Sequence, residues 1–424
     1  MKTDESLNRL ARQAVIAVVP KRLTLGCRRN QENKYRSNRD FCENHRLGGA
    51  MSAGNEVAGA VSISDEFENL HEIVVKAHQV LPKEKWDSLI GGAETETTLK
   101  RNRLAIDSIA FKPRVLRNVS TVDLSVEYFG RKLRLPVFLA PTGPLNLFGD
   151  GGGATVAKAA QAFDIGHMLS SGCTPLEAVA EAASSALRMA QLYVRGDDGF
   201  VHEYVGRALA CGCAAICLTV DSAVLARRDR DIANRYRTAG LAKRPDQSHQ
   251  AALDWRTVKL IKDSYNIPLA LKGIATAEDA RIAVDHGVDW IYVSNHGGRQ
   301  LDHGRGTIDA LPEIIDAIAG RARVMVDGGF CRGSDIIKAL AIGADLVGLG
   351  RMQCYALAAG GEAAIIRMLE LLEDEMLRSM ALLGVPTIGE LGRSYLHPAA
   401  PVAIPSALSA FPLIDLSRIS SRLS

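Results

Sequence analysis

The chain lacks a long hydrophobic run. None of its apolar stretches approaches the roughly 20 residues that a helix needs to cross a bilayer. The early run from Ala14 to Val19 is short even for the core of a signal peptide. An excess of one charge is also missing, because 51 Lys and Arg against 48 Asp and Glu leave a net charge of +3. We therefore expect a soluble protein with no membrane span and no electrostatic reason to bind nucleic acid.

The eight cysteines lack the paired spacing of a metal site or a disulfide framework. Cys211, Cys213 and Cys217 lie in or just before an apolar, strand-like run, which favours buried thiols. We expect no metal and a reducing, cytoplasmic location. What the chain does have is ordinary globular composition, with 47% hydrophobic and 23% charged residues.

Charge is unevenly distributed along the chain. Residues 1–50 carry 11 Lys and Arg against 5 Asp and Glu and show no hydrophobic periodicity, so residues 1–64 are predicted to be a disordered basic leader. Our hypothesis is that translation starts at Met51, and peptides from residues 1–50 in the native protein would contradict it. A basic targeting arm is the competing interpretation. The folded unit is expected over residues 65–395, and the Pro- and Ser-rich residues 396–424 are expected to be an unpacked tail.

Short apolar runs rich in β-branched residues alternate with stretches of helical apolar spacing. Strand then helix, eight times, predicts an α/β protein with a (β/α)8 barrel. A doubly wound open sheet is the alternative, because counting strands does not prove closure. Residues 65–120 read as an N-terminal extension of helix, loop and helix that packs across the barrel bottom or lids an edge. The expected strands are Val137–Ala140, His167–Ser170, Met189–Val194, Ala214–Val220, Ile267–Lys272, Trp290–Ser294, Val324–Asp327 and Leu346–Gly350. The clearest helical stretches are Gly153–Phe163, Pro175–Ala186, Thr276–His286, Ile308–Ala319 and Gly333–Ala341.

Polar residues and glycines cluster where the expected strands end. In a barrel these ends meet at one face, which is where active sites lie. One strand runs into a loop that carries His296, Arg299 and Asp302 around two glycines. A base beside a guanidinium is suited to removing a proton next to a carboxylate-bearing carbon. A loop whose polar groups are merely solvated is the alternative.

The last two expected strands end in glycine-rich turns. These turns are Asp327-Gly328-Gly329 and Gly350-Arg351, and each leads toward a helix. Backbone N–H groups, helix N-termini and the Arg351 guanidinium together predict a phosphate site, because barrels commonly bind phosphate after their last two strands.

With these motifs the chain resembles the FMN-dependent α-hydroxy acid oxidases and dehydrogenases, the group of glycolate oxidase, lactate oxidase and mandelate dehydrogenase. The resemblance spans about residues 65–395 and implies FMN as cofactor and oxidation of an L-2-hydroxy acid to the 2-oxo acid. Its markers are Gly-Ala-Glu at 92–94, Ala-Pro-Thr at 140–142, Gln-Leu-Tyr-Val at 191–194, Leu-Thr-Val-Asp at 218–221, Lys-Gly at 272–273, the loop 294–302, Asp-Gly-Gly at 327–329 and Gly-Arg at 350–351.

The resemblance implies a role for each matching position. His296 matches the base, and Asp221 matches the carboxylate that stabilises its imidazolium. Arg228 and Arg299 match the pair of guanidinium groups that hold the substrate carboxylate, and Tyr193 matches a tyrosine that hydrogen-bonds the substrate.

The resemblance also implies a cofactor site. Lys272 matches a catalytic lysine beside the flavin ring, where negative charge accumulates. The implied cofactor-binding positions are Thr142, Gly143, Ser170, Gln191, Thr219, Lys272, Ser294, Asp327, Gly328, Gly329, Arg332, Gly350 and Arg351.

Three positions depart from the family's pattern. Ser88 stands where members that oxidise small acids usually carry a carboxylate-binding tyrosine, and Gly172 stands where an aromatic pocket residue often follows Ser-Ser. Both changes open space, so we predict a substrate bulkier than glycolate or lactate. Cys331 replaces an arginine that clamps the phosphate. Either Arg332 substitutes for it from the next position, or FMN binds less tightly by about 1.5–3 kcal/mol.

Other properties are not encoded in a motif. The electron acceptor is unidentified, and family analogy implies a homotetramer or octamer. Two alternatives to oxidation are an FMN barrel with non-redox, isomerase-type chemistry and a barrel kept only as a binding protein. The intact set of catalytic residues argues against both.

Overall fold

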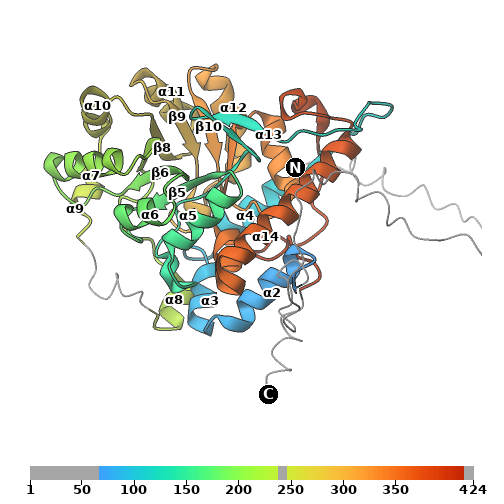
Figure 1. Ribbon diagram of the computed structural model, residues 1–424, viewed down its shortest axis with the longest axis horizontal. Helices are drawn as coiled ribbons and strands as arrows, with labels where there is room; N and C mark the ends of the chain where they lie inside the picture. Colours follow the sequence, from blue (N-terminus) through green and yellow to red (C-terminus); the bar gives the residue numbers. More distant parts are fainter. Residues whose placement is uncertain (1–65, 237–245, 415–424) are drawn as a thin grey trace, which may run out of the picture. The chain divides into compact units, whose positions relative to one another are not determined.

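The computed structural model describes residues 66–236 and 246–414. Eight parallel strands close into a barrel, with β11 pairing with β4 to complete the ring. Figure 1 shows helices such as α7, α10 and α11 on the outside of the labelled strands. The predicted (β/α)8 barrel is therefore confirmed, and the open sheet is wrong. In chain order the strands are β4 (Val137–Leu139), β5 (Gly166–Ser170), β6 (Leu187–Leu192), β7 (Ala215–Thr219), β8 (Leu269–Ile274), β9 (Trp290–Val293), β10 (Arg323–Val326) and β11 (Leu346–Leu349).

Helices alternate with these strands as the sequence predicts. Polar caps fix several of the starts: the side chain of Thr276 accepts the Asp279 N–H, and that of Asp197 accepts the Phe200 N–H. The five helices predicted by range all begin within one residue of the expected start. They are α5 (Gly153–Ala162), α6 (Leu176–Ala182), α11 (Ala277–Asp285), α12 (Thr307–Ile318) and α13 (Gly333–Ile342). The other helices after the first barrel strand are α7 (Asp198–Ala210), α8 (Asp229–Ala233), α9 (Ser248–Ala251), α10 (Trp255–Ser264) and α14 (Arg351–Leu383).

The barrel interior is a packed core. Residues of most of the strands are buried on both faces, as expected for a parallel sheet that helices cover on the outside. Phe138, Met168, Met189, Tyr292 and Met325 belong to one buried cluster inside the ring. The polar residues at the strand ends therefore sit above a rigid apolar base.

The N-terminal extension consists of three helices: α2 (Leu70–Val80), α3 (Lys83–Ile90) and α4 (Thr97–Asp107). The turn between α3 and α4 lies at the C-terminal face of the barrel, because Ala93 N donates to Gly298 O at 2.8 Å and Glu94 N to Arg227 O at 2.9 Å. The extension therefore covers an edge of the active face.

The expectation that the extension closes the barrel bottom is wrong. A hairpin of β2 (Val126–Tyr128) and β3 (Arg131–Leu133) lies there instead. Its Phe129 ring stacks at 4.9 Å on Trp290, the first residue of β9.

The end of the chain is packed at two places. β12 (Leu396–Pro398) pairs antiparallel with β1 (Ile109–Phe111), and Phe411 is 1% exposed with its ring 5.6 Å from that of His71. The expectation of an unpacked tail is therefore wrong for β12 and for Phe411, because burial of an aromatic ring outweighs the loop-like composition around it, while Val402 and Ile404 between them are exposed. The predicted leader, residues 1–64, and residues 415–424 lie outside the described residues.

The described residues contain neither a membrane-spanning helix nor a cluster of metal ligands. No helix there is long and apolar enough to cross a bilayer. Within the same ranges no three His, Cys, Asp or Glu side chains gather as they would around a metal ion.

Candidate active site

The loop after β9 holds His296 in an uncommon backbone conformation. His296 has a φ of +58° and opens a short 3-10 turn, η3 (His296–Gly298). Its N–H donates to Ser294 Oγ at 3.1 Å, while Ser294 Oγ donates to Asp327 Oδ1 at 2.6 Å. The turn is pressed against α4, since a Cβ added at Gly298 would lie 2.5 Å from Leu99 N. A strained non-glycine residue held this firmly is typical of a functional position.

Asp302, at the other end of this loop, serves the fold. Its carboxylate accepts the N–H of Thr98 at 2.7 Å and that of Thr95 at 3.0 Å, at the start of α4. Burial would raise the pKa of Asp302, but these hydrogen bonds lower it below its ordinary value. The carboxylate therefore anchors the loop to the N-terminal extension.

His296 lies between a carboxylate and a phenol. Its Nδ1 is 3.1 Å from Asp221 Oδ1, and its Nε2 is 3.2 Å from the Tyr193 hydroxyl. Ser222 Oγ donates to Asp221 Oδ1 at 3.0 Å and so helps to orient that carboxylate. Because an ionised Asp221 accepts the Nδ1 proton, Nε2 faces the site as the basic nitrogen.

The surroundings of His296 favour its neutral form. Burial lowers the pKa of His296, Lys272 and Arg228 lower it further, and Asp221 opposes them. Burial would raise the pKa of Asp221, but His296 and Lys272 bring it to about 2. At neutral pH the imidazole is therefore neutral and the carboxylate ionised.

Lys272 at the end of β8 is a buried ammonium group. Burial opposes its charge, but Asp327, Asp221 and Tyr193 outweigh burial and raise its pKa above the ordinary value. The next residue, Gly273, has a φ of +114°, and a Cβ there would lie 2.6 Å from Asp221 Cβ. Only glycine therefore lets the backbone next to Lys272 come this close to Asp221.

Arg228, Arg299 and Arg351 gather at the same face, and no carboxylate of residues 66–236 or 246–414 forms an ion pair with them. Arg299 Nη1 donates to the carbonyls of Ser88 at 2.6 Å and Gly91 at 2.8 Å, and Arg351 Nη2 also donates to Gly91 O at 2.8 Å. The Nε of Arg228 is buried without a hydrogen-bond partner among the described residues. The ends of α3 and η3 thus supply neutral carbonyls where buried arginines ordinarily find acids.

Mutual repulsion makes this cluster a site for anions. Burial, Arg228 and Arg351 hold the pKa of Arg299 well below its ordinary value. Burial and Arg351 likewise lower the pKa of Arg228, and Asp231 opposes them without forming an ion pair. A bound carboxylate or phosphate would relieve the repulsion and add charge-assisted hydrogen bonds.

A second set of predicted residues lines the barrel mouth beside Lys272. Gln191 Nε2 donates to Thr219 Oγ1 at 2.8 Å, and Gln191 Oε1 is buried without a donor among the described residues. Thr142 receives a hydrogen bond at 3.3 Å from Gln353 of α14. Ser170 is buried at the end of β5. The structure therefore places these residues at the barrel mouth, where the Oε1 atoms of Gln191 and Gln353 are both buried without a donor among the described residues.

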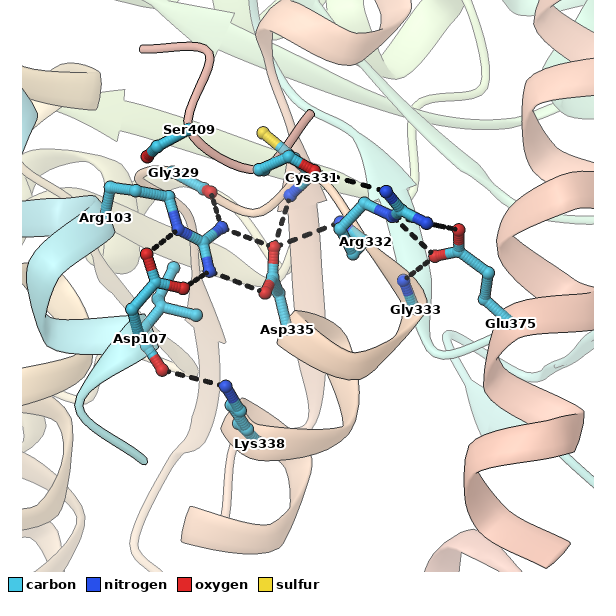
Figure 2. Close-up of polar contacts among 12 residues, drawn as sticks. Arg103, Asp107, Gly329, Cys331, Arg332, Gly333, Asp335, Lys338, Glu375 and Ser409 are labelled. Carbon is cyan, nitrogen blue, oxygen red and sulfur yellow. Dashed lines mark hydrogen bonds and ion pairs between the residues drawn. The ribbon is translucent and has the colours of Figure 1, made fainter. Parts of the chain in front are cut away.

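The start of α13 differs from this pattern, because carboxylates occupy it (Figure 2). The N–H groups of Cys331 and Arg332 donate to Asp335 Oδ2 at 2.9 and 3.0 Å. The Arg332 guanidinium pairs with Glu375 of α14, with Nε 2.9 Å from Oε1. The expectation that Arg332 replaces the missing phosphate arginine is therefore not supported, since its charge is already neutralised. Gly350 and Arg351 are left as the phosphate candidates, because no side chain caps the N-terminus of α14.

Comparison with known proteins agrees with this geometry. Residues 77–398 match the family model described as FMN-dependent dehydrogenase. The chain belongs to this family. Glycolate oxidase 1 of Oryza sativa subsp. indica is 39% identical over 356 residues, which cover 78% of this chain and 96% of that protein. L-lactate oxidase of Nostoc sp. is 38% identical and is covered to 98%.

Solved structures give the same result. The structure of mandelate oxidase with (S)-2-phenylpropionate has a TM-score of 0.73 and 36% identity and covers 80% of this chain and 100% of that one. The structure of mandelate oxidase with benzoyl-formic acid has a TM-score of 0.72. The chain is therefore an FMN-dependent oxidoreductase of the 2-hydroxy acid oxidase family, acting on CH–OH groups.

The residues present fit FMN. The orphaned Gln191 Oε1 suits an N–H donor such as that of the flavin ring, and buried Lys272 suits the carbonyl end of a ring that gains negative charge. The uncapped helix start at Gly350 and Arg351 suits the phosphate.

Sequence reasoning missed several contributors. Tyr292 donates to Asp327 Oδ2 at 2.7 Å inside the barrel, and Gln353 Nε2 bonds the carbonyls of Ala140 at 2.7 Å and Leu349 at 2.8 Å. Period-two alternation places Tyr292 on the inner face and could have indicated its role. No pattern in the sequence connects Gln353 with the strand ends that it holds.

Proposed function

We propose that the chain oxidises an L-2-hydroxy acid to the 2-oxo acid with His296 as the base. The observation that carries the proposal is a neutral histidine, bracketed by Asp221 and Tyr193, beside a cluster of arginines without acidic partners. When bound, FMN supplies the acceptor for the two electrons that leave the substrate.

The arginines bind the substrate, and the histidine accepts its proton. Arg228 and Arg299 bind the substrate carboxylate, which relieves their repulsion and fixes the 2-hydroxyl near His296. His296 Nε2 takes a proton from the substrate, and ionised Asp221 at Nδ1 stabilises the imidazolium. Tyr193 hydrogen-bonds the substrate oxygen. Lys272 provides a fixed positive charge where negative charge develops.

The substrate is proposed to be bulkier than glycolate or lactate. Ser88 contributes only its carbonyl to the arginine cluster, and a Cβ added at Gly172 would meet a single neighbouring atom within 4 Å. Both positions therefore leave room beside the base. Steady-state kinetics with glycolate or lactate as the best of a broad panel would contradict this.

An anaerobic absorbance titration of the purified flavoprotein with 2-hydroxy acids tests the proposal. Bleaching of the flavin band by one class of acid is expected, and the His296→Gln variant should hold flavin but bleach far more slowly. A bound flavin that no 2-hydroxy acid reduces would contradict the proposal and favour non-redox chemistry. The acceptor is tested by admitting air, and the homotetramer or octamer and the cytoplasmic location stay predictions.

A further inference from the structure

Gly172 leaves an opening at the mouth of the barrel. It follows β5 directly after Ser171, whose Oγ accepts the N–H of Tyr193 at 3.1 Å. The only heavy atom within 4 Å of a Cβ placed on Gly172 is Arg195 Nη2, at 3.4 Å. A guanidinium group therefore lies over the glycine, beside the residue that contacts the base.

Arg195 follows β6 shortly after this strand ends at Leu192. Tyr193, Val194 and Arg195 continue the chain without regular structure, and the side chain of Val194 is buried while that of Arg195 is exposed. The guanidinium group beside Gly172 therefore comes from the segment that also carries Tyr193.

Arg195 is exposed and carries a charge without a partner. It forms no hydrogen bond or ion pair within residues 66–236 and 246–414. Two other exposed arginines, by contrast, are paired: Arg207 Nε lies 2.8 Å from Glu177, and Arg230 Nε lies 2.5 Å from Glu96. An arginine directed at a glycine and lacking an acid is free to bind an anion from solution.

We infer that Arg195 is a specificity residue that binds a second anionic group of the substrate, so the substrate class is a 2-hydroxy acid with a second carboxylate at its far end. The inference rests on the proposed function. Arg228 and Arg299 hold the carboxylate next to the reacting carbon, and Arg195 meets the distal one over Gly172.

A matched pair of substrates tests the inference. 2-Hydroxyglutarate and 2-hydroxypentanoate have the same number of carbons and differ in the distal carboxylate. We expect a higher kcat/KM for 2-hydroxyglutarate. Arg195→Gln should lower that value about 10- to 100-fold while leaving 2-hydroxypentanoate within about twofold, because a charge-assisted hydrogen bond is lost for one substrate only. Arg207→Gln, which removes an exposed arginine from α7, is the matched control and should change neither.

The result that overturns the inference is an equal effect of Arg195→Gln on both acids, or a wild-type preference for the neutral one. A binding measurement separates this from failure of the proposed function. Glutarate, which cannot be oxidised, should perturb the flavin spectrum more strongly than pentanoate, and Arg195→Gln should abolish the difference. That difference without reduction of flavin by any 2-hydroxy acid would uphold the anion site and refute the oxidation. No difference, with normal reduction by 2-hydroxypentanoate, would refute the role of Arg195 alone.

Discussion

Two groups of arginines in the barrel differ in whether carboxylates pair with their guanidinium groups. At the start of α13, Arg103 pairs with Asp335 at 2.7 Å and with Asp107, and Arg332 pairs with Glu375 (Figure 2). At the catalytic face, Arg228, Arg299 and Arg351 have no carboxylate within ion-pair distance among the described residues. A buried guanidinium group destabilises the fold unless an anion pairs with it.

The difference separates structure from function. Where the protein supplies the acid, the arginine stabilises the fold. Where the protein supplies no acid, the arginine can bind an anionic ligand, and its unpaired charge lowers the stability of the ligand-free fold. Mutations at the start of α13 should therefore lower the stability of the protein, and mutations in the cluster of Arg228, Arg299 and Arg351 should lower its activity.

Replacement of His296 by Gln should have the largest effect, confined to catalysis. Loss of the general base lowers kcat by roughly 10²–10⁴-fold, while the thermal midpoint of the flavoprotein stays near that of the wild type. Stopped-flow flavin reduction measures the rate and calorimetry the stability. A variant with wild-type kcat would remove His296 from the mechanism.

Replacement of Asp335 by Asn should be the largest change in stability. It leaves Arg103 buried with one acid fewer and weakens the acceptor for the Cys331 N–H, which costs about 3–5 kcal/mol. Urea unfolding of the flavoprotein measures this. Asp263→Asn removes the exposed pair with Lys259 and should cost under about 1 kcal/mol. Equal losses in the two variants would mean that the buried network has no special role.

Replacement of Arg299 by Gln should show the reverse pattern. Relief of the repulsion from Arg228 and Arg351 should leave the free energy of unfolding unchanged or raise it. Loss of a charge-assisted bond to the substrate should remove about 1.5–3 kcal/mol of transition-state stabilisation, which lowers kcat/KM roughly 10- to 150-fold. Unfolding and steady-state kinetics on one preparation make the comparison. A loss of stability like that of Asp335→Asn would break the distinction between the two groups.

The pH dependence should follow from the lowered pKa of His296. The base must be neutral, so kcat/KM should be level above about pH 6.5 and fall only as the pH drops through the lowered pKa. Asp221→Asn removes a charge that raises this pKa and should move the acid limb to lower pH. Lys272→Met removes a charge that lowers it and should move the limb to higher pH. Shifts of the same sign would contradict the assignment of the limb to His296.

The sequence predicted the barrel and the meeting of its strand ends because both have local signatures. Alternating apolar runs mark the strands, and strand ends in a closed barrel converge on one face wherever they lie in the chain. His296, Asp221 and Lys272 therefore come together as expected. Proline and serine around Phe411 hid a packed segment, because composition does not report which single ring is buried.

Partners distant in sequence could not be predicted in this way. Arg332 was assigned to the phosphate because it neighbours Cys331, yet Glu375 lies on another helix and takes its charge. Nothing in the local pattern of α14 distinguishes Glu375 from a solvated acid. For the same reason the sequence did not predict that Arg299 donates hydrogen bonds to the carbonyls of Ser88 and Gly91.

The smallest expected effect concerns Cys331, which separates the two groups of arginines. It is buried and neutral, because burial raises the pKa of its thiol to about 12. Cys331→Arg should add a guanidinium whose nearest acid, Asp335, is already shared with Arg103, so the new charge is left for the phosphate. FMN binding should tighten about tenfold, since a charge-assisted bond of about 1.5 kcal/mol is gained. Fluorescence titration of the apoprotein measures it, with riboflavin as the control because it lacks the phosphate. Equal tightening for both flavins would trace the effect to packing, and no tightening for FMN would show that α14 and Arg351 already suffice for the phosphate.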